Sequence, residues 1–129
     1  MSKKLKYFFR TLKSKKRKKI FGPNAKGIIY DSKNGYMALP ISDITIGKNL
    51  GFKGHWNFNE IQKLLQQTTQ DDVIYFIGTH VGTLLVPIAK KVKTVVGFEA
   101  NEDTFWFIKA NLCLNKISNA TIFNKAVGD

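Results

Sequence analysis

The stretch YFIGTHVGTLL, Tyr75–Leu85, decides the fold, because it predicts a buried strand that enters a glycine-containing turn and then a helix. Gly78 and Gly82 give the pattern G-x-x-x-G. The first glycine permits a sharp turn, and the second lets the backbone come close to a ligand or to the sheet. Such a turn is typical of a nucleotide-like ligand site, although a packing turn would look the same.

Strand and helix patterns alternate after this turn. KTVVGFEA (93–100) predicts a second buried strand, NEDTFWFIKANLCLNK (101–116) a helix, and ATIFNKAVGD (120–129) the start of a third strand. This order indicates a parallel sheet with right-handed crossovers, whose ligands bind at the carboxyl ends of the strands. We therefore expect the glycine turn, residues 99–101 and the end of the third strand to surround one crevice.

Glu99 ends the second predicted strand, 17 residues after Gly82. A carboxylate there can accept hydrogen bonds from both hydroxyls of a ribose, although it could also be a solvated acid. His80 replaces the second glycine of the dinucleotide fingerprint, and Thr83 replaces the lysine of the phosphate loop. S-adenosylmethionine has no pyrophosphate, so among nucleotide-like ligands this loop favours it.

Residues 71–129 resemble the first half of the FkbM-type S-adenosylmethionine-dependent methyltransferases. The upstream segment IGKNLGFKGHWNFNEIQKLL resembles the family's lead-in, so that the resemblance covers roughly residues 43–129. The resemblance rests on the glycine turn, Phe98-Glu99-Ala100-Asn101, Asn111-Leu112-x-Leu114-Asn115 and Ala126-Val127-Gly128, in that order. It implies a Rossmann-like methyltransferase fold and methyl transfer to a hydroxyl of a sugar or secondary metabolite. The cofactor residues that it implies are Gly78, Thr79, His80, Gly82, Glu99, Ala100, Asn101, Ala126 and Val127. No catalytic base is assigned, and His80 is expected to supply a backbone N–H.

The sequence departs from this family in two positions and in extent. Phe76 replaces the acid that precedes the first glycine, and Ala100 replaces a proline after Glu99. The second half of the family domain does not follow. We therefore expect a fragment or a truncated form, in which a three-stranded half-sheet has an open edge and an uncovered face.

Residues 1–26 form a basic leader, predicted to be partly helical, which holds 11 of the 21 Lys and Arg residues and no acid. Leu5, Phe8, Phe9 and Leu12 fall on one helical face. The leader could be a solvated helix, dock on an anionic membrane surface, or bind nucleic acid. Nucleic acid is the least favoured partner, because the body shows no basic and aromatic platform. The alternative function is a non-catalytic module that this leader tethers to an anionic surface.

Residues 27–70 predict a hairpin with a turn at Asn34-Gly35, an irregular glycine-rich loop, and a helix capped by Asn57 or Asn59. The lone Cys113 excludes an internal disulfide and fits a reducing compartment, so we expect a cytoplasmic protein or one at the membrane periphery. Two distant His and one Cys form no zinc pattern, and no apolar run is long enough to span a membrane.

Overall fold

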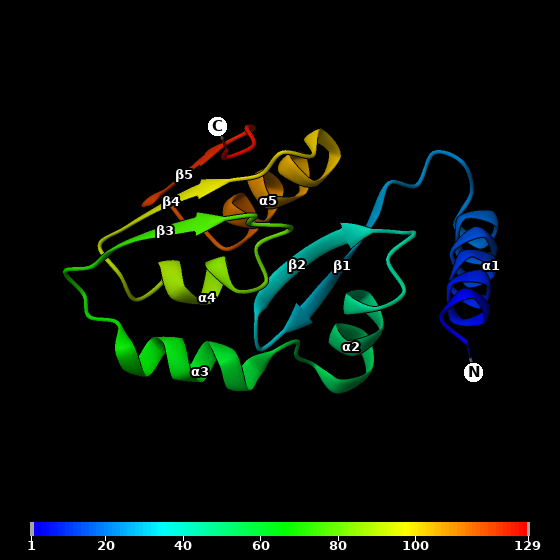
Figure 1. Ribbon diagram of the computed structural model, residues 1–129, viewed down its shortest axis with the longest axis horizontal. Helices are drawn as coiled ribbons and strands as arrows, with labels where there is room; N and C mark the ends of the chain where they lie inside the picture. Colours follow the sequence, from blue (N-terminus) through cyan, green and yellow to red (C-terminus); the bar gives the residue numbers. More distant parts are fainter. Residues whose placement is uncertain (1, 129) are drawn as a thin grey trace.

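The computed structural model describes residues 2–128, which form five helices, a two-stranded hairpin and a three-stranded parallel sheet (Figure 1). The elements are α1 (Lys3–Phe21), β1 (Gly27–Ser32), β2 (Gly35–Pro40), α2 (Ile46–Lys53), α3 (Phe58–Gln67), β3 (Val73–Ile77), α4 (Leu85–Ala89), β4 (Thr94–Phe98), α5 (Glu102–Leu114) and β5 (Ala120–Phe123). The predicted α/β class is confirmed, with its leader helix, hairpin and parallel half-sheet.

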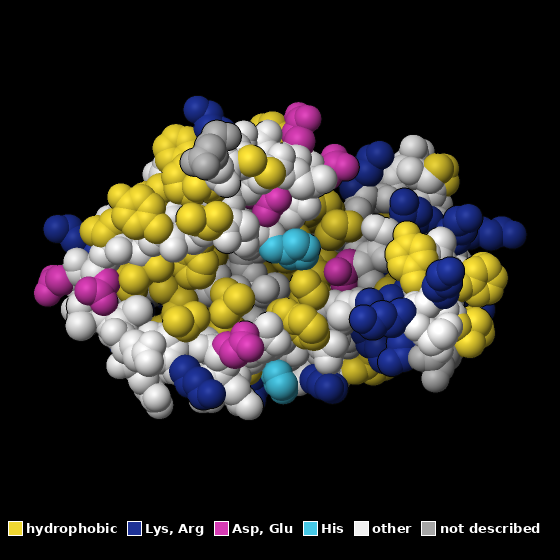
Figure 2. All heavy atoms as spheres, viewed as in Figure 1, with side chains coloured by type: hydrophobic (Ala, Val, Ile, Leu, Met, Phe, Trp, Pro, Cys, Tyr) yellow, Lys and Arg dark blue, Asp and Glu magenta, His cyan; other side chains and the backbone are white. Residues whose placement is uncertain are grey.

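The parallel sheet has the order β3-β4-β5 and is buried on one face only. Val95 of β4 and Ile122 of β5 belong to a core shared with α4, α5 and β2. On the opposite face, Tyr75 and Ile77 are 67% and 70% exposed. Figure 2 shows apolar side chains gathered over this sheet. The expected uncovered face is therefore confirmed, and the prediction of a buried strand is wrong for this face of β3.

The helix after the glycine turn, α4, is shorter than its sequence suggests because Pro87 lies inside it. Proline has no N–H, so it cannot bond to the carbonyl of Thr83, four residues earlier. That carbonyl instead accepts a hydrogen bond from Asn34 Nδ2 at 2.9 Å. Buried Asn34 also bonds to the N–H and the carbonyl of Trp56, both at 2.8 Å. The hairpin turn therefore joins α4 to the segment before α3.

One asparagine of α5 and the asparagine that caps its C-terminus hold strand β2 of the hairpin. Asn111 Oδ1 accepts from the N–H of Ala38 at 2.6 Å, and its Nδ2 donates to the Ala38 carbonyl at 3.0 Å. Asn115 makes the same pair of bonds with Tyr36, at 3.0 and 2.7 Å. Four helical residues rise about 6 Å and two strand residues span about 6.6 Å, so the spacings match. We call these four bonds the asparagine clamp.

The segment between the hairpin and the parallel sheet contains a helix that the sequence analysis did not predict. α2 occupies the segment expected to be an irregular loop, despite its glycines. A Cβ on Gly47 would lie 2.7 Å from Tyr30 Oη, and one on Gly51 would lie 3.2 Å from the same ring. These glycines thus let α2 pack closely against β1. Asn57 precedes α3 as predicted, but its side chain makes no capping bond.

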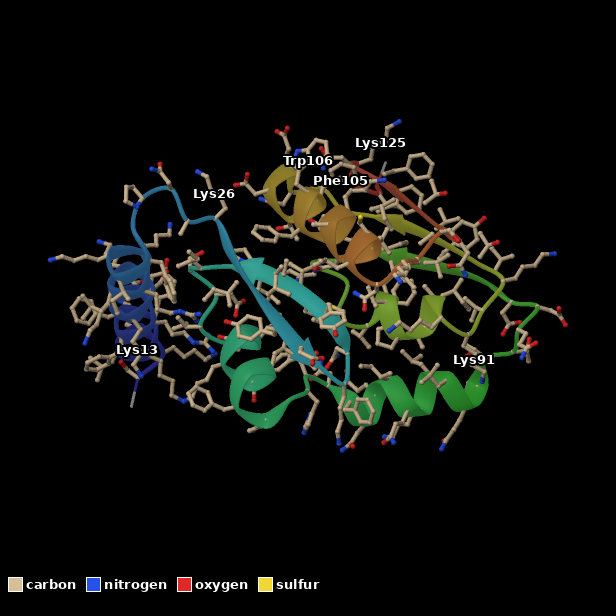
Figure 3. All side chains as sticks on the ribbon, turned by 180° about the vertical axis from the view of Figure 1, so that it is seen from behind. Lys13, Lys26, Lys91, Phe105, Trp106 and Lys125 are labelled. Atoms are coloured by element: carbon tan, nitrogen blue, oxygen red, sulfur yellow. The ribbon has the colours of Figure 1, made fainter. Side chains whose placement is uncertain are left out.

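The basic leader forms α1, which stands at the margin of the molecule beside α2 (Figures 1 and 3). Ser2 caps it, with its hydroxyl accepting from the N–H of Leu5 at 3.3 Å. None of its residues is buried. Within the described residues, no helix combines the length and the hydropathy needed to cross a membrane.

Candidate functional site

The strand-to-helix turn begins at Gly78, whose φ of +75° is in the left-handed region. The N–H groups of Gly78 and Thr79 both donate to the carbonyl of Phe98, at 2.9 and 3.1 Å. Thr79 is buried, and its Cγ2 lies 2.5 Å from the place where a Cβ on Gly97 would stand. The predicted site residue Thr79 therefore shapes the turn, and its side chain packs over the sheet.

The two glycines of the turn have different surroundings. Gly82 has a φ of +88°, and a Cβ there would overlap Cδ1 of Ile108 in α5. Gly78 has no neighbour within 4 Å of such a Cβ. Gly82 therefore serves the close packing of the turn on α5, and Gly78 leaves open space at the edge of the sheet.

Glu99 lies one residue beyond β4, beside this turn. Its Oε2 accepts a hydrogen bond from the N–H of His80 at 2.8 Å, and its Oε1 accepts from the N–H of Asn101 at 2.9 Å. Each carboxylate oxygen has a second lone pair and can accept another bond. The two N–H groups thus fix a carboxylate that can still accept hydrogen bonds from two hydroxyls. His80 takes part through its backbone N–H.

Asn101 and Ala100 complete this edge of the sheet. The side chain of Asn101 caps α5, because its Oδ1 accepts from the N–H of Thr104 at 2.9 Å. The following residues, Glu102 and Asp103, lie in the first turn of α5, where the helix dipole favours acids. Ala100 is exposed next to them. Asn101 therefore orders the backbone N–H that holds Glu99.

Asn124, which the sequence reading missed, links the third strand to this edge. Its Nδ2 donates to the carbonyls of Glu99 and Ala100, at 2.8 and 3.3 Å. Its position as the first polar residue after β5 was the available signal. Ala126 and Val127, predicted near an adenine, are exposed in the irregular segment that follows. The ends of all three strands therefore meet here, and the roles of Ala126 and Val127 stay predictions.

Phe76, in the position of the family acid, faces the helices. It pairs with Gly97 in the sheet register, and its half-buried ring packs against the hydrophobic core. The phenyl ring therefore stabilises the turn by apolar contact, and it provides no acceptor for a ligand.

The site is an open edge. Two cavities of about 640 and 730 Å³ lie against α1, and neither includes the glycine turn or Glu99. Within residues 2–128, no three His, Cys, Asp or Glu side chains gather as they would around a metal ion. The chemistry of the edge is that of one fixed carboxylate and the backbone groups beside it.

Comparisons with known proteins support the fold. No protein-family model and no curated protein matches the sequence. Among solved structures, Trm5b from Pyrococcus abyssi is 19% identical, with a TM-score of 0.62 over 84% of this chain and 30% of that one. TYW2 from M. jannaschii in complex with AdoMet is 19% identical, with a TM-score of 0.62 over 78% of this chain and 43% of that one. The M. jannaschii tRNA m1G37 methyltransferase is 19% identical, with a TM-score of 0.59 over 82% of this chain and 31% of that one.

These identities are too low to show more than a common fold. The chain spans less than half the length of each of the three proteins. Its α3, glycine turn, parallel strands and α5 are arranged as a Rossmann-like sheet with the candidate site at the carboxyl ends of the strands. The chain therefore has the Rossmann-like methyltransferase fold and covers part of it.

Proposed function

We propose that this chain supplies the S-adenosylmethionine-binding part of a methyltransferase. The observation that carries the proposal is the Glu99 carboxylate, fixed by the N–H groups of His80 and Asn101 beside the open Gly78. A carboxylate fixed in this way recognises a ribose diol, because both oxygens have acceptor capacity left. The complex of TYW2 with AdoMet, a protein of the same fold, supports the choice of ligand.

The residues fit this cofactor better than a pyrophosphate-containing one. Glu99 would hold the ribose, and the Gly78–Gly82 turn would lie along the methionine end. When bound, the sulfonium supplies an activated methyl group. The chain's contribution would be orientation, because fixing the donor against the acceptor in line lowers the entropic part of the barrier. Base catalysis is assigned to no residue of this chain.

We infer that the methyl acceptor is a hydroxyl of a sugar or secondary metabolite, in line with the resemblance to FkbM-type enzymes. Incubation with methyl-labelled S-adenosylmethionine and a panel of glycosides is expected to give labelled methyl ethers. A transfer RNA in a parallel reaction tests the rival acceptor. Label found in the RNA alone would contradict the hydroxyl acceptor and leave the cofactor proposal intact.

Replacing Glu99 tests the ribose contact. Glu99→Gln is expected to weaken S-adenosylmethionine binding roughly 10- to 100-fold, since one charge-assisted hydrogen bond contributes about 1.5–3 kcal/mol. Isothermal titration calorimetry measures the effect. Glu60→Gln, an acid in the first turn of α3, is the matched control and should bind as the unchanged chain does. Equal affinities of the two variants would exclude Glu99 as the ribose ligand.

Restoring the family acid tests the other side of the turn. Phe76→Asp is expected to cost about 2 kcal/mol of stability, because a half-buried ring is replaced by a carboxylate. If an acid there contacts the cofactor, S-adenosylmethionine should raise the melting temperature of this variant more than that of the unchanged chain. Thermal melts with and without the cofactor measure both effects. An equal rise in the two proteins would show that the loop backbone and Glu99 suffice.

A further inference from the structure

The orientation of α1 on the body is set by one arginine. Arg17 Nη1 donates to the carbonyl of Asp43 at 2.6 Å, and Nη2 donates to Tyr30 Oη at 3.0 Å. The side chain is partly buried, whereas no residue of α1 is fully buried. Thr11 and Ser14 are also partly buried, so the side of α1 that faces the protein contains Thr11, Ser14 and Arg17.

Three apolar residues of α1 lie on the opposite side, whereas Phe9 and Ile20 line the groove beside α2. Successive helical residues turn by about 100°, so Phe8 is about 180° from Arg17, Leu12 about 140° and Leu5 about 120°. Their exposed fractions are 56%, 46% and 44%. These three side chains thus form an apolar stripe that points away from the body and takes no part in the hydrophobic core of the described residues.

Lysines surround this stripe. By the same rotation, Lys4, Lys15 and Lys19 lie within about 40° of the direction of Phe8. We call these lysines and the stripe together the outward face. No acid occurs in residues 1–30, so the charge of the outward face is uncompensated along α1. Figure 2 shows Lys and Arg gathered over α1 and the surface beside it.

We propose that the outward face docks on an anionic lipid surface, with Leu5, Phe8 and Leu12 at the boundary between headgroups and acyl chains. An amphipathic helix binds there through a hydrophobic and an electrostatic contribution, because apolar side chains leave water and flanking lysines contact anionic headgroups. Long lysine side chains can extend from the edge of the helix to the headgroups. Charge complementarity and the apolar stripe select this occupant together.

A nucleic acid fits the same surface less well. It would pair with the lysines but leave the three apolar side chains in water. The surface that suits a polyanion is a different one, the groove of about 730 Å³ between α1 and α2. Its cations are Lys6, Arg10, Lys13, Lys16, Arg17 and Lys48. Variants of the outward face and of the groove therefore separate the two partners.

Vesicle co-sedimentation of the 129-residue chain tests the apolar stripe. The chain is expected to sediment with vesicles of phosphatidylcholine mixed with phosphatidylserine, and much less with phosphatidylcholine alone. Phe8→Ser with Leu12→Ser should reduce the bound fraction roughly tenfold. Phe52→Ser on α2, at a residue 87% exposed, is the matched control and should bind normally. Since α1 has no buried residue, these changes leave the body folded, which thermal melts check.

Charge variants complete the test. Lys15→Gln with Lys19→Gln should weaken binding to the anionic vesicles, and Lys53→Gln with Lys63→Gln should not. The proposal is overturned if the chain does not sediment with the anionic vesicles, or if replacing Phe8 and Leu12 leaves the bound fraction unchanged. It is also overturned if a transfer RNA binds in place of lipid and Lys13→Gln with Lys48→Gln abolishes that binding.

Discussion

Gly82→Ala is expected to lower the free energy of unfolding by about 3 kcal/mol, one of the two largest effects in the chain. Gly82 has a φ of +88°, which costs a residue with a Cβ about 1–2 kcal/mol. The new Cβ would also overlap Cδ1 of Ile108, and overpacking a core costs about 1–3 kcal/mol. Urea unfolding monitored by circular dichroism measures the loss.

Two further variants isolate the cause. Gly78→Ala has the same backbone penalty but open space around the Cβ, so it should cost only about 1 kcal/mol. Ile108→Val removes the overlapping methyl and should recover part of the loss when combined with Gly82→Ala. Additive effects of the two changes, or equal costs at the two glycines, would contradict the packing role of Gly82.

Asn111→Ala is expected to cost about 3–4 kcal/mol, because Asn111 is 0% exposed and makes three hydrogen bonds. The change leaves the N–H and carbonyl of Ala38 and the carbonyl of Val81 without this partner in the interior. The hairpin edge would lose half of the asparagine clamp. The same unfolding measurement gives the cost.

Asn115→Ala is the matched control within the asparagine clamp. It removes the equivalent pair of bonds to Tyr36. Tyr36 is half exposed, so water can replace the side-chain amide of Asn115. Its cost should stay near 1 kcal/mol. If the two variants prove equally destabilising, burial is not what makes the Asn111 contact strong.

Local patterns predicted most of the fold. The alternation of apolar strands and helices from residue 71 onward gave the parallel sheet, and the glycines gave its first turn. α2 was missed because Gly47 and Gly51 suggest a loop, and only the ring of Tyr30 explains them. Full burial of β3 was wrong, since a run of apolar residues does not reveal whether a second layer covers the sheet.

The candidate site was predictable to a lesser degree. The distance along the chain placed Glu99 beside the glycine turn, because the ends of parallel strands lie at one edge. Spacing could not show that the N–H groups of His80 and Asn101 hold the carboxylate. Asn111 entered the sequence analysis only as part of a family motif, and the structure buries it against Ala38. A side-chain amide that bonds to a distant strand leaves no signal in local periodicity.

The backbone amides of His80 and Asn101 offer the most direct test that the chain binds S-adenosylmethionine through the ribose. Both bond to Glu99, so their nitrogen–proton NMR signals report on that carboxylate. Titration with S-adenosylmethionine should shift both signals to saturation. Adenosine, which also has the ribose, should shift both signals too, whereas methionine should leave the Asn101 signal unmoved. If S-adenosylmethionine leaves both signals unmoved, the proposed cofactor site is wrong.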